Sequence, residues 1–543
     1  MSHGPFSAVS PLRRSSKRSP ATRSNGWGSR PRPPCRCLRT RCPCHDRTGR
    51  RVGSPAVELP LLAVTLSDAA GAVRADVRGE DGRFLTDASY DSRAVAPDSL
   101  FFCIVGDHVD GHRFAPEAVA AGAGAIVVER WLPLDAPQAL VPSVRGAIGP
   151  MSSVVFGRPA EALTTIGITG TNGKTTTTYL LEAIIRAGGA RAGIIGTNGA
   201  RIDGNPVELA RTTPEAPDLH RLLARMRAAG VGTVAMEVSS HALAQQRVGG
   251  VMFDVAVFTN LSHDHLDYHG TMQRYLDTKA DLFTPNHAAR GVLNADDPSA
   301  RRLIRRAAIP VVTYAIDRDA DLRALDVAVD AGGISFRVEG VEVRSTLRGR
   351  FNVWNCLAAM GSAREVGISL ETAARALRGV RDIPGRMETI DAGQEFLVVV
   401  DYAHTPDSIR VVLRGARSLA AGRVIVVFGC GGDRDPAKRA PMGQAATSSA
   451  DLTVITTDNP RSEDPLVIIE EIVPGAVAGG GDYVVEPDRR AAIRLAVREA
   501  HQGDIVVIAG KGHESYQEVA GTTVPFDDRS IARDELGSLL EGA

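Results

Sequence analysis

The 543-residue sequence lacks the features of a membrane-spanning or exported protein. It has no run of about 18 or more apolar residues, which a membrane-spanning helix requires. Its basic first residues are not followed by the apolar core of roughly 7–15 residues that an export signal contains. Repeats of solenoid length are also missing. These absences predict a cytoplasmic protein without membrane insertion, and we further expect a monomer.

The chain also lacks net charge, with 63 Lys and Arg residues against 63 Asp and Glu residues. The balance is uneven, because residues 1–52 hold 13 basic residues and a single acid, Asp46. The remainder therefore holds 50 basic and 62 acidic residues, a charge of −12. A mildly acidic body is not typical of a nucleic-acid-binding protein, so we expect no nucleic-acid partner.

Residues 1–57 have few large aliphatic side chains and are dominated by Arg, Pro, Ser and Gly. Such a segment cannot bury enough apolar surface to offset the entropy of ordering, so we predict a disordered basic extension. It contains four of the seven cysteines, followed by a histidine: Cys35, Cys37, Cys42, Cys44 and His45. Zinc sites usually separate paired ligands by two to four residues, whereas these pairs are separated by one. The spacing favours a plain extension, which a start codon placed too far upstream would explain, over a zinc site.

The other cysteines, Cys103, Cys356 and Cys430, are scattered in apolar contexts. This usage is typical of a reducing compartment and predicts no structural disulfides.

Beyond residue 57, apolar runs alternate with helical patterns in three blocks, which predicts an α/β protein of three domains. Residues 58–162 form a small α/β domain, with strands at 100–105 and 125–128 and a helix at 114–122. Residues 163–385 form a central parallel-sheet domain, with a β-rich appendage at 324–346 and helical residues at 353–378. Its predicted strands are 163–169, 192–196, 233–238, 253–259 and 290–294.

The third block, residues 386–543, resembles an open, doubly wound Rossmann-like sheet. Its predicted strands are 396–400, 424–428, 452–456 and 505–509, and its helices are 406–420, 488–501 and 529–540. Polar or Gly-rich segments follow all four strands: 401–404, 429–435, 458–461 and 510–514. Ligands of such sheets bind beyond the carboxyl ends of the strands. The pattern therefore predicts a ligand site in this domain.

A phosphate-binding loop is predicted where the central domain's first strand meets a helix. Its residues are Gly170, Thr171, Asn172, Gly173, Lys174, Thr175 and Thr176. Glycines let backbone N–H groups face a phosphate, and the helix N-terminus adds favourable partial charge. Lys174 can reach the β- and γ-phosphates of a nucleotide, and the Thr175 hydroxyl can hold Mg²⁺. The loop has the short GxxGK[ST] form, since Ile168 stands where the longer form has its first glycine.

Metal-binding side chains follow two later strands of the same domain. Glu237 ends one strand, and the next leads into a segment that contains His263, Asp264 and His265. If the two strands are adjacent, their ligands can converge on one phosphate-bound Mg²⁺, which prefers oxygen donors. Lys279 lies on a predicted helix, and its residue pattern alone is that of a solvated lysine.

Nine segments in one order resemble the Mur ligases, over residues 58–543. They are ITGTNGKTTTT, MEVSSHAL, FTNLSHDHLDYHG, YLDTKADLF, GRME, DYAHTPDS, FGCGGDRD, TDNPR and AGKGHE. The resemblance implies an ATP-dependent ligase of peptidoglycan precursor synthesis that forms an amide through an acyl phosphate.

The resemblance also implies roles for individual residues. Lys279 would be carbamylated by CO₂, which turns an ammonium into an anion that can hold a second Mg²⁺. Thr175 and Glu237 would hold the first metal, His265 would lie near the second, and Lys174, Lys279 and His265 would be catalytic. Asn355 would contact adenine, Asp401 the ribose and Arg386 the phosphates. The UDP-sugar substrate would meet Ser92, Asp107, His108, Val109, Thr212, Thr213, Ser239, Gln245 and Arg247. Tyr90 and Arg211 depart from the family pattern, in which Leu and Asn can occupy these positions, and neither is assigned to substrate.

The acceptor amino acid implied by Asp458, Asn459, Pro460 and Arg461 is meso-diaminopimelate, joined to the D-glutamate of UDP-N-acetylmuramoyl-L-alanyl-D-glutamate. Diaminopimelate differs from lysine by a distal carboxylate, and an Arg fork pairs with carboxylate in a bidentate way. Arg434, Gly510 and Glu514 would complete the pocket, with Glu514 facing an ammonium. A lysine-adding ligase, a folate polyglutamate ligase and a nucleotide-dependent switch remain the alternatives.

Overall fold

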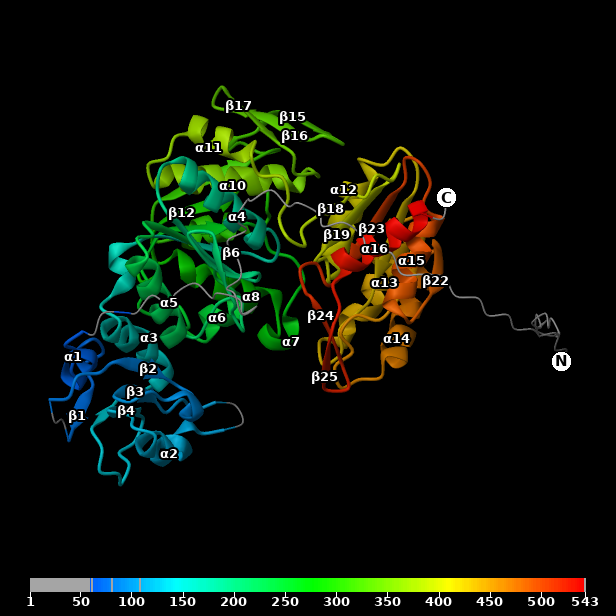
Figure 1. The fold of residues 1–543 in the computed structure, drawn as a ribbon. Coiled ribbons are helices and arrows are strands. Elements are labelled where there is room, and N and C mark those ends of the chain that lie inside the picture. The colour runs from blue at the N-terminus through cyan, green and yellow to red at the C-terminus, as the bar shows by residue number, and fades with distance from the viewer. Residues whose placement is uncertain (1–58, 60–61, 80–81, 107–108, 542–543) are drawn as a thin grey trace, which may run out of the picture. The chain divides into compact units, whose positions relative to one another are not determined.

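The computed structural model describes residues 59, 62–79, 82–106 and 109–541 (Figure 1). The predicted extension at residues 1–57 and two predicted site residues, Asp107 and His108, lie outside the described residues. The described residues belong to one compact unit, Val57–Ala543. Within it, each of the three predicted α/β regions has a sheet of its own.

The first sheet has five strands in the order β1-β5-β4-β3-β2, and only β1 runs antiparallel to its neighbour. These are β1 (Asp76–Arg78), β2 (Asp87–Ser89), β3 (Ser99–Phe102), β4 (Ala125–Val128) and β5 (Gln138–Leu140). Successive residues of β4 enter different cores, because side chains alternate along a strand. Helices α1 (Leu66–Gly71) and α3 (Val144–Val155) pack on one side and α2 (Ala115–Ala120) on the other.

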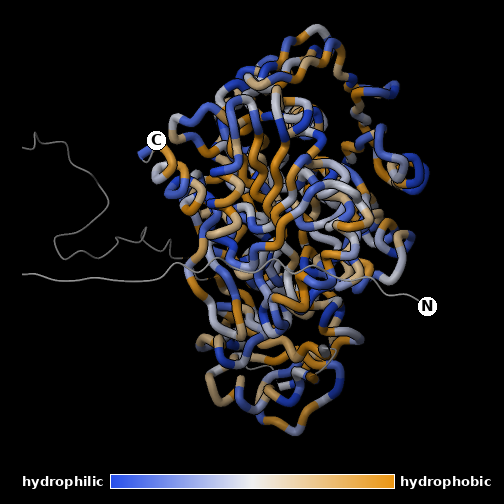
Figure 2. Tube along the Cα trace, turned by 90° about the vertical axis from the view of Figure 1, so that its right-hand side faces the viewer, coloured by the Kyte–Doolittle hydropathy of each residue, from blue (hydrophilic) through white to orange (hydrophobic). Residues whose placement is uncertain are grey.

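The central sheet has nine strands in the order β14-β13-β12-β11-β6-β10-β7-β8-β9. The strands from β14 to β7 are parallel, and β8 and β9 extend the sheet antiparallel. The parallel strands are β6 (Thr164–Thr169), β7 (Ala192–Gly196), β10 (Thr233–Glu237), β11 (Phe253–Phe258), β12 (Ala288–Asn294), β13 (Val311–Ala315) and β14 (Leu322–Arg323). The antiparallel strands are β8 (Gly199–Ile202) and β9 (Asn205–Val207). Hydrophobic residues form the interior strands (Figure 2), as expected for a parallel sheet buried on both faces.

Helices cover both faces of the central sheet (Figure 1). One face is covered by α4 (Lys174–Ala187), α10 (Phe351–Glu365) and α11 (Leu370–Leu377). The other is covered by α5 (Ala216–Ala228), α6 (Ser240–Ala244) and α8 (Met272–Ala280). Two more helices, α7 (Leu266–His269) and α9 (Ala300–Arg306), follow β11 and β12 along the chain. The predicted appendage is a separate three-stranded sheet of β15 (Leu325–Asp330), β16 (Gly333–Val338) and β17 (Val341–Ser345).

The third sheet has the order β18-β19-β23-β20-β21-β22, with only β18 antiparallel. Its strands are β18 (Glu388–Ile390), β19 (Leu397–Asp401), β20 (Val424–Phe428), β21 (Leu452–Ile455), β22 (Asp482–Val485) and β23 (Ile505–Ala509). Helices α12 (Pro406–Arg417), α13 (Arg439–Thr447) and α14 (Pro465–Gly479) pack on one face. Helices α15 (Arg489–Glu499) and α16 (Asp528–Glu541) pack on the other, so the predicted doubly wound arrangement is confirmed.

Two sequence-based expectations are wrong in detail. Strands β10 and β11, whose adjacency the predicted metal site assumed, are separated by β6, which pairs with both. The single helical stretch predicted at 353–378 is interrupted between α10 and α11, where Gly367 adopts a φ of 88° and Ser369 caps the second helix. The prediction also missed α13, α14, β22 and the hairpin of β24 (Tyr516–Val519) and β25 (Thr522–Pro525).

Close packing of α13 against α14 depends on a buried glycine. A Cβ added at Gly475 would overlap the carbonyl oxygen of Ala440 on the facing helix. We expect Gly475→Ala to lower the free energy of unfolding by about 1–3 kcal/mol, as overpacking does. Gly537→Ala on α16 is the matched control, since nothing lies within 4 Å of its added Cβ; it should be neutral or stabilise by up to about 1 kcal/mol. Thermal melts of both variants measure this, and equal melting temperatures would contradict the packing argument.

Candidate active site

The phosphate-binding loop lies between β6 and α4 and is built around two glycines in conformations that other residues rarely adopt. Gly170 has a φ of 147° and Gly173 a φ of 88°. Each also lacks room for a side chain, since an added Cβ would overlap Thr259 Oγ1 at Gly170 and Asn355 Oδ1 at Gly173. The glycines are therefore required both by backbone geometry and by close approach of neighbouring segments.

The segment after β11 holds this loop in place. Backbone N–H groups of Thr171 and Asn172 donate to the carbonyl oxygen and to Oδ1 of Asn260, both at 2.9 Å. Thr259 Oγ1 donates to the carbonyl oxygen of Asn172 at 2.6 Å. The Ser262 N–H in turn donates to Thr171 Oγ1 at 3.0 Å. The loop conformation is thus fixed by a neighbouring strand end rather than by the loop alone.

Lys174 and Thr175 open helix α4 directly at the loop. Lys174 Nζ donates to the carbonyl oxygens of Gly170 and Thr171 at 3.0 and 2.9 Å. Burial lowers the pKa of the Lys174 ammonium, while the nearby Glu237 and Asp264 carboxylates oppose that shift. Arg386 Nη2 donates to Thr175 Oγ1 at 2.9 Å, which brings this arginine to the loop as the sequence predicted.

Glu237, at the end of β10, lies on the other side of β6. Glu237 is 1% exposed. Its carboxylate accepts hydrogen bonds from the Thr197 N–H at 2.9 Å and the Thr197 hydroxyl at 3.0 Å. Glu237 and Thr175 line the same cavity of about 240 Å³, together with Lys174 and Asp264. Carboxylate and hydroxyl oxygens are donors that Mg²⁺ prefers, so these residues fit a magnesium site.

No three His, Cys, Asp or Glu side chains converge on a possible metal position anywhere in the part of the chain that the structure describes. A metal at this cavity would therefore use the Thr175 hydroxyl, the Glu237 carboxylate and oxygens of the bound substrates, which is a set typical of Mg²⁺ beside phosphates.

Lys279 is buried, contrary to the solvated lysine that its pattern alone indicates. Lys279 is 1% exposed, and its Nζ donates to the Gly170 carbonyl oxygen at 3.0 Å. The ammonium lies 4.6 Å from the centre of the Tyr275 ring. Burial first, and then the Lys174 charge, place the pKa of Lys279 well below its ordinary value. The neutral amine is the form that can react with CO₂, so this environment fits a carbamate.

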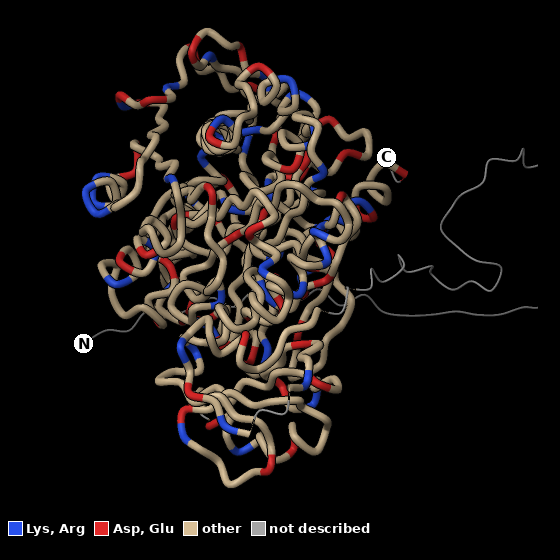
Figure 3. The backbone as a smooth tube through the Cα atoms, turned by 90° about the vertical axis from the view of Figure 1, so that its left-hand side faces the viewer, with Lys and Arg blue, Asp and Glu red and all other residues tan. Residues whose placement is uncertain are grey.

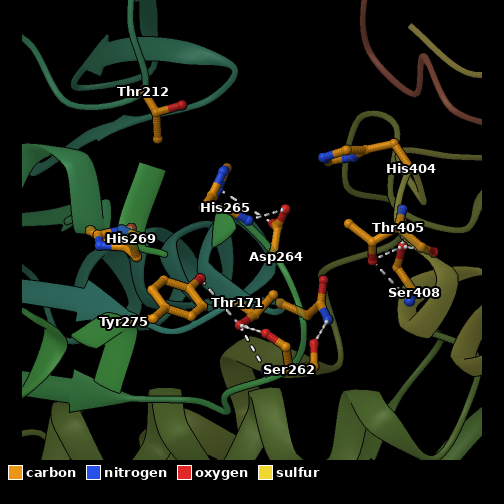
Figure 4. A network of polar contacts seen from close by, with 12 residues as sticks. Thr171, Thr212, Ser262, Asp264, His265, His269, Tyr275, His404, Thr405 and Ser408 are labelled. Atoms are coloured by element: carbon orange, nitrogen blue, oxygen red, sulfur yellow. Dashed lines mark hydrogen bonds and ion pairs between the residues drawn. The ribbon is translucent and has the colours of Figure 1, made fainter. Parts of the chain in front are cut away.

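A cluster of histidines and tyrosines continues from Tyr275 (Figure 4). The Tyr275 ring stacks on His269 with centroids 4.9 Å apart, and its hydroxyl lies 3.3 Å from Thr171 Oγ1. His265 pairs with Asp264, with Nε2 and Oδ2 3.3 Å apart, and both side chains point toward the space that His404 faces. Burial lowers the pKa of His265 to about 4, against the opposing Asp264 charge, so the imidazole is neutral near pH 7.

The cavity beside the phosphate loop also contains the residues predicted for adenosine. Asn355 and Asp401 line it, together with Phe351 and Val412. Asp401 accepts from the N–H groups of Met387 and Ala403, both at 2.8 Å, and burial raises its pKa against the opposing effect of Arg386. The predicted nucleotide-binding residues from two sheets therefore lie around one space.

A larger cavity of about 650 Å³ lies next to it and contains the predicted acceptor residues. The two cavities share walls, made by Thr212, Ser239, Asp264, His265, Tyr402 and His404. Arg434, Asp458, Asn459, Arg461, Gly510 and Glu514 all line the larger one, at the carboxyl ends of β20, β21 and β23. Pro460 lies between two of these residues but is absent from the cavity lining.

The acceptor loops are tied together by hydrogen bonds. Asn459 Nδ2 donates to Glu514 Oε2 at 2.8 Å, and the fully buried Lys511 donates to Asn459 Oδ1 at 3.1 Å. Arg461 adopts a φ of 53° and donates from Nη1 to the Gly432 carbonyl oxygen at 2.6 Å. Burial and the Asp458 charge raise the pKa of Glu514, while Lys511 opposes the shift. The lining of this cavity therefore includes both carboxylates, Asp458 and Glu514, and guanidinium groups, Arg434 and Arg461.

The residues predicted for the UDP-sugar are only partly brought together. Thr212, Thr213, Ser239 and Arg247 line the larger cavity, and Gln245 accepts a hydrogen bond from Arg247 Nη2. Ser92 donates to Glu117 Oε2 at 3.0 Å instead, and neither Ser92 nor Val109 is among the residues that line the cavities described here.

A third cavity, of about 270 Å³, includes Tyr90 and Arg211, the two positions not assigned to substrate. It shares Ala210 and Arg211 with the larger cavity, so all three spaces are neighbours. Basic and acidic residues are interspersed along the chain elsewhere (Figure 3).

Sequence reasoning missed several residues of the site. Tyr275, Thr197, Tyr402 and Lys511 touch predicted residues, but each stands in a pattern that is ordinary for a helix, a turn or a strand end. Only the resemblance segments that contain Tyr275, Tyr402 and Lys511 gave a signal near them.

Comparison with known protein families accounts for this arrangement. Residues 86–147 match the model of the Mur ligase family catalytic domain, and residues 168–363 match the Mur ligase middle domain. Residues 385–512 match the Mur ligase glutamate ligase domain. The chain belongs to the Mur ligase family.

Individual relatives are similar over nearly their whole length. A UDP-N-acetylmuramoyl-L-alanyl-D-glutamate–2,6-diaminopimelate ligase of Geobacillus kaustophilus is 49% identical over 454 residues, which cover 82% of this chain and 93% of the relative. The protein of that name from Streptomyces avermitilis is 43% identical over 492 residues, 88% of this chain and 97% of its own. A solved structure of a ligase with the same name is 35% identical, with a TM-score of 0.61, and the match covers 84% of this chain and 95% of that one.

The contact between Gly173 and Asn355 yields a test of the nucleotide site. We expect Gly173→Ala to weaken ADP binding at least about tenfold, because the added Cβ displaces Asn355 and the loop. Gly189→Ala, just after the same helix, is the matched control: Gly189 also has a positive φ, of 90°, but nothing lies within 4 Å of its added Cβ. The control should cost only stability. Calorimetric titration with ADP measures both, and equal affinities would refute the assignment of this cavity.

Proposed function

We propose that the chain is an ATP-dependent ligase that joins meso-diaminopimelate to the D-glutamate of UDP-N-acetylmuramoyl-L-alanyl-D-glutamate in peptidoglycan precursor synthesis. The observation that carries the proposal is the large cavity, which has a phosphate loop beside one wall and Arg461 with Glu514 on another. Relatives at 43–49% identity bear the name of this ligase. Because one chain supplies all three cavities, we propose that it acts as a monomer, and because its substrates are ATP and a nucleotide-linked precursor, in the cytoplasm.

The acceptor end of the cavity matches meso-diaminopimelate in charge. Diaminopimelate has two ammonium groups and two carboxylates, one more carboxylate than lysine. Arg461 and Arg434 would pair with the distal carboxylate, and Asp458 and Glu514 lie where an ammonium would be held. Arg461 also contacts the Gly432 carbonyl oxygen and Glu518. Lysine lacks the distal carboxylate and would not supply the bidentate partner that diaminopimelate offers to this guanidinium. The lysine-adding alternative is therefore not favoured. A folate polyglutamate ligase adds glutamate, which has no second ammonium for Asp458 and Glu514 to hold. A nucleotide-dependent switch would not need an acceptor cavity.

The chain's own residues would act mainly by holding reactants in place. ATP transfers its γ-phosphoryl group to the γ-carboxylate of D-glutamate, with ADP as the leaving group. The acceptor amine then attacks the acyl phosphate, loses a proton, and releases phosphate from the tetrahedral intermediate. Lys174 would donate to phosphate oxygens in place of its two loop carbonyl partners. Arg386, which donates to Thr175, would likewise donate to phosphate oxygens. The shared wall at His265 and Ser239 lies between the nucleotide and acceptor spaces, where the D-glutamate carboxylate must meet first the γ-phosphate and then the acceptor amine.

Two groups that are not part of the polypeptide would complete the site. Thr175 and Glu237 would hold one Mg²⁺, and a carbamate on Lys279 would be an anionic ligand for a second. The two cations would supply charge neutralisation for the transferred phosphoryl group. The neutral His265 imidazole lines the same cavity as Thr175 and Glu237 and would be suited to a metal or to a phosphate oxygen.

The acceptor specificity is the direct test of the function. Purified protein should form a product with meso-diaminopimelate, seen by mass spectrometry, at a rate at least about 100-fold higher than with lysine at equal concentration. Arg461→Met should remove most of this preference by raising the KM for diaminopimelate, because the distal carboxylate loses its bidentate partner.

Arg498→Met is the control for this experiment, since Arg498 lies on an exposed face of α15 and lines none of the three cavities. A wild-type preference for lysine would contradict the proposed acceptor. Unchanged specificity in Arg461→Met would contradict the role of the arginine.

The carbamate on Lys279 makes a spectroscopic prediction. The depressed pKa of Lys279 leaves its amine neutral at pH values where an exposed lysine is charged, so ¹³C-labelled bicarbonate should give a protein carbamate signal near neutral pH. Lys279→Arg should lose this signal and lower kcat by at least about 100-fold, since it leaves a cation where an anion is needed. A labelled signal that persists in Lys279→Arg would exclude this residue as the carbamylated group.

A further inference from the structure

One buried carboxylate holds three arginines at the boundary between the first and central sheets. Glu215, whose side chain is 6% exposed, stands immediately before α5. Its Oε2 lies 2.8 Å from Arg145 Nη1, and its Oε1 lies 2.9 Å from Arg247 Nε and 3.2 Å from Arg211 Nη1. Arg145 comes from α3, which packs on the first sheet, whereas Arg211 and Arg247 come from the central region.

Two of the three arginines border the proposed substrate space. Arg247 lines the largest cavity, and Arg211 lines both that cavity and the one that contains Tyr90. Arg247 is further fixed by hydrogen bonds to the Thr213 carbonyl oxygen at 3.3 Å and to Gln245 Oε1. Glu215 itself lines the Tyr90 cavity. The Glu215 and Arg247 side chains, 6% and 11% exposed, are therefore buried parts of the wall, whereas the Arg211 side chain is 48% exposed.

The cluster has more positive than negative charge. One carboxylate faces three guanidinium groups, which leaves a surplus of two positive charges. The neighbouring acid, Asp218, does not offset them, because it accepts from the Tyr90 hydroxyl at 2.9 Å and pairs with Arg221 at 2.7 Å. Guanidinium groups that are partly desolvated and held in fixed positions are suited to carboxylate or phosphate oxygens.

We propose that Glu215 is a positioning residue for the nucleotide-linked substrate. It fixes Arg211 and Arg247, and the two charges that it leaves uncompensated bind an anionic group of that substrate. The anion is either the diphosphate or a carboxylate of the peptide, which share this chemistry. The assignment of the ligand rests on the proposed function, whereas the geometry of the cluster does not.

The positioning role and a simple charge effect predict opposite results for Glu215→Gln. This variant keeps the side chain's size but raises the surplus charge from two to three. If only net charge mattered, the substrate would bind more tightly. If Glu215 orients the arginines, binding of UDP-N-acetylmuramoyl-L-alanyl-D-glutamate should weaken about tenfold, because charged hydrogen bonds lose their geometry. The KM values for ATP and for the acceptor should stay within about twofold of wild type.

A double variant separates orientation from charge and protects the test against misfolding. Glu215→Gln combined with Arg145→Gln restores the surplus of two positive charges and removes part of the repulsion among the arginines. We expect its substrate affinity to remain reduced by about tenfold. Glu182→Gln is the matched control, since Glu182 is also buried and paired with two arginines, Arg186 and Arg201, but lines none of the three cavities.

Calorimetric titration with the full substrate, with UDP and with the free L-alanyl-D-glutamate dipeptide identifies the anion. Weaker UDP binding in Glu215→Gln assigns the diphosphate, and unchanged UDP binding with weaker substrate binding assigns a carboxylate. Unchanged or tighter substrate binding would overturn the proposal, as would equal losses for all three substrates. A wild-type protein that binds the nucleotide substrate but forms no amide would refute the proposed function and leave this binding test intact.

Discussion

The constraint on which the site depends is that parallel strands end at one edge of a sheet. Strand β6 lies between β10 and β11, so the phosphate loop after β6 emerges between Glu237 and the segment that begins at Thr259. That segment fixes the loop through Asn260 and Thr259, while Glu237 is held by Thr197 beyond β7. The catalytic elements are therefore positioned by sheet pairing, and the loop glycines are needed because three segments approach each other closely there.

The same principle applies to the third sheet. The predicted polar segments follow β19, β20, β21 and β23, which are parallel neighbours, and all four contribute to the largest cavity. Arg386, from the segment that leads into this sheet, reaches Thr175 at the phosphate loop of the central sheet. The Thr175 hydroxyl, which the resemblance places at a metal, therefore also links the phosphate loop to the segment that leads into the third sheet.

Much of the fold could be predicted from the sequence because its strands are short, continuous apolar runs. The strands β4, β7, β20 and β23 match their predicted ranges, since a strand buried on both faces leaves such a run. Helix α14 was missed because Pro474 lies inside it, and β24 because its residues are partly exposed and polar. Strand order could not be predicted, because β6 pairs with β10 and β11, which are distant in the sequence. Local periodicity contains no information on such long-range pairing. For the site, the glycine loop and Arg461 have local signals, but the burial of Lys279 depends on how α8 packs beneath the loop.

The burial of Lys174 and Lys279 places two lysine side chains close together at the phosphate loop. The Nζ atoms of both lysines donate to the same Gly170 carbonyl oxygen. Burial lowers the pKa of each lysine. Two cations so close would repel if both stayed protonated in a desolvated space. In the proposed mechanism, a nucleotide's phosphates would pair with Lys174, and carbamylation would turn the Lys279 amine into an anion. Both changes would reduce the repulsion between the two lysines that contact Gly170.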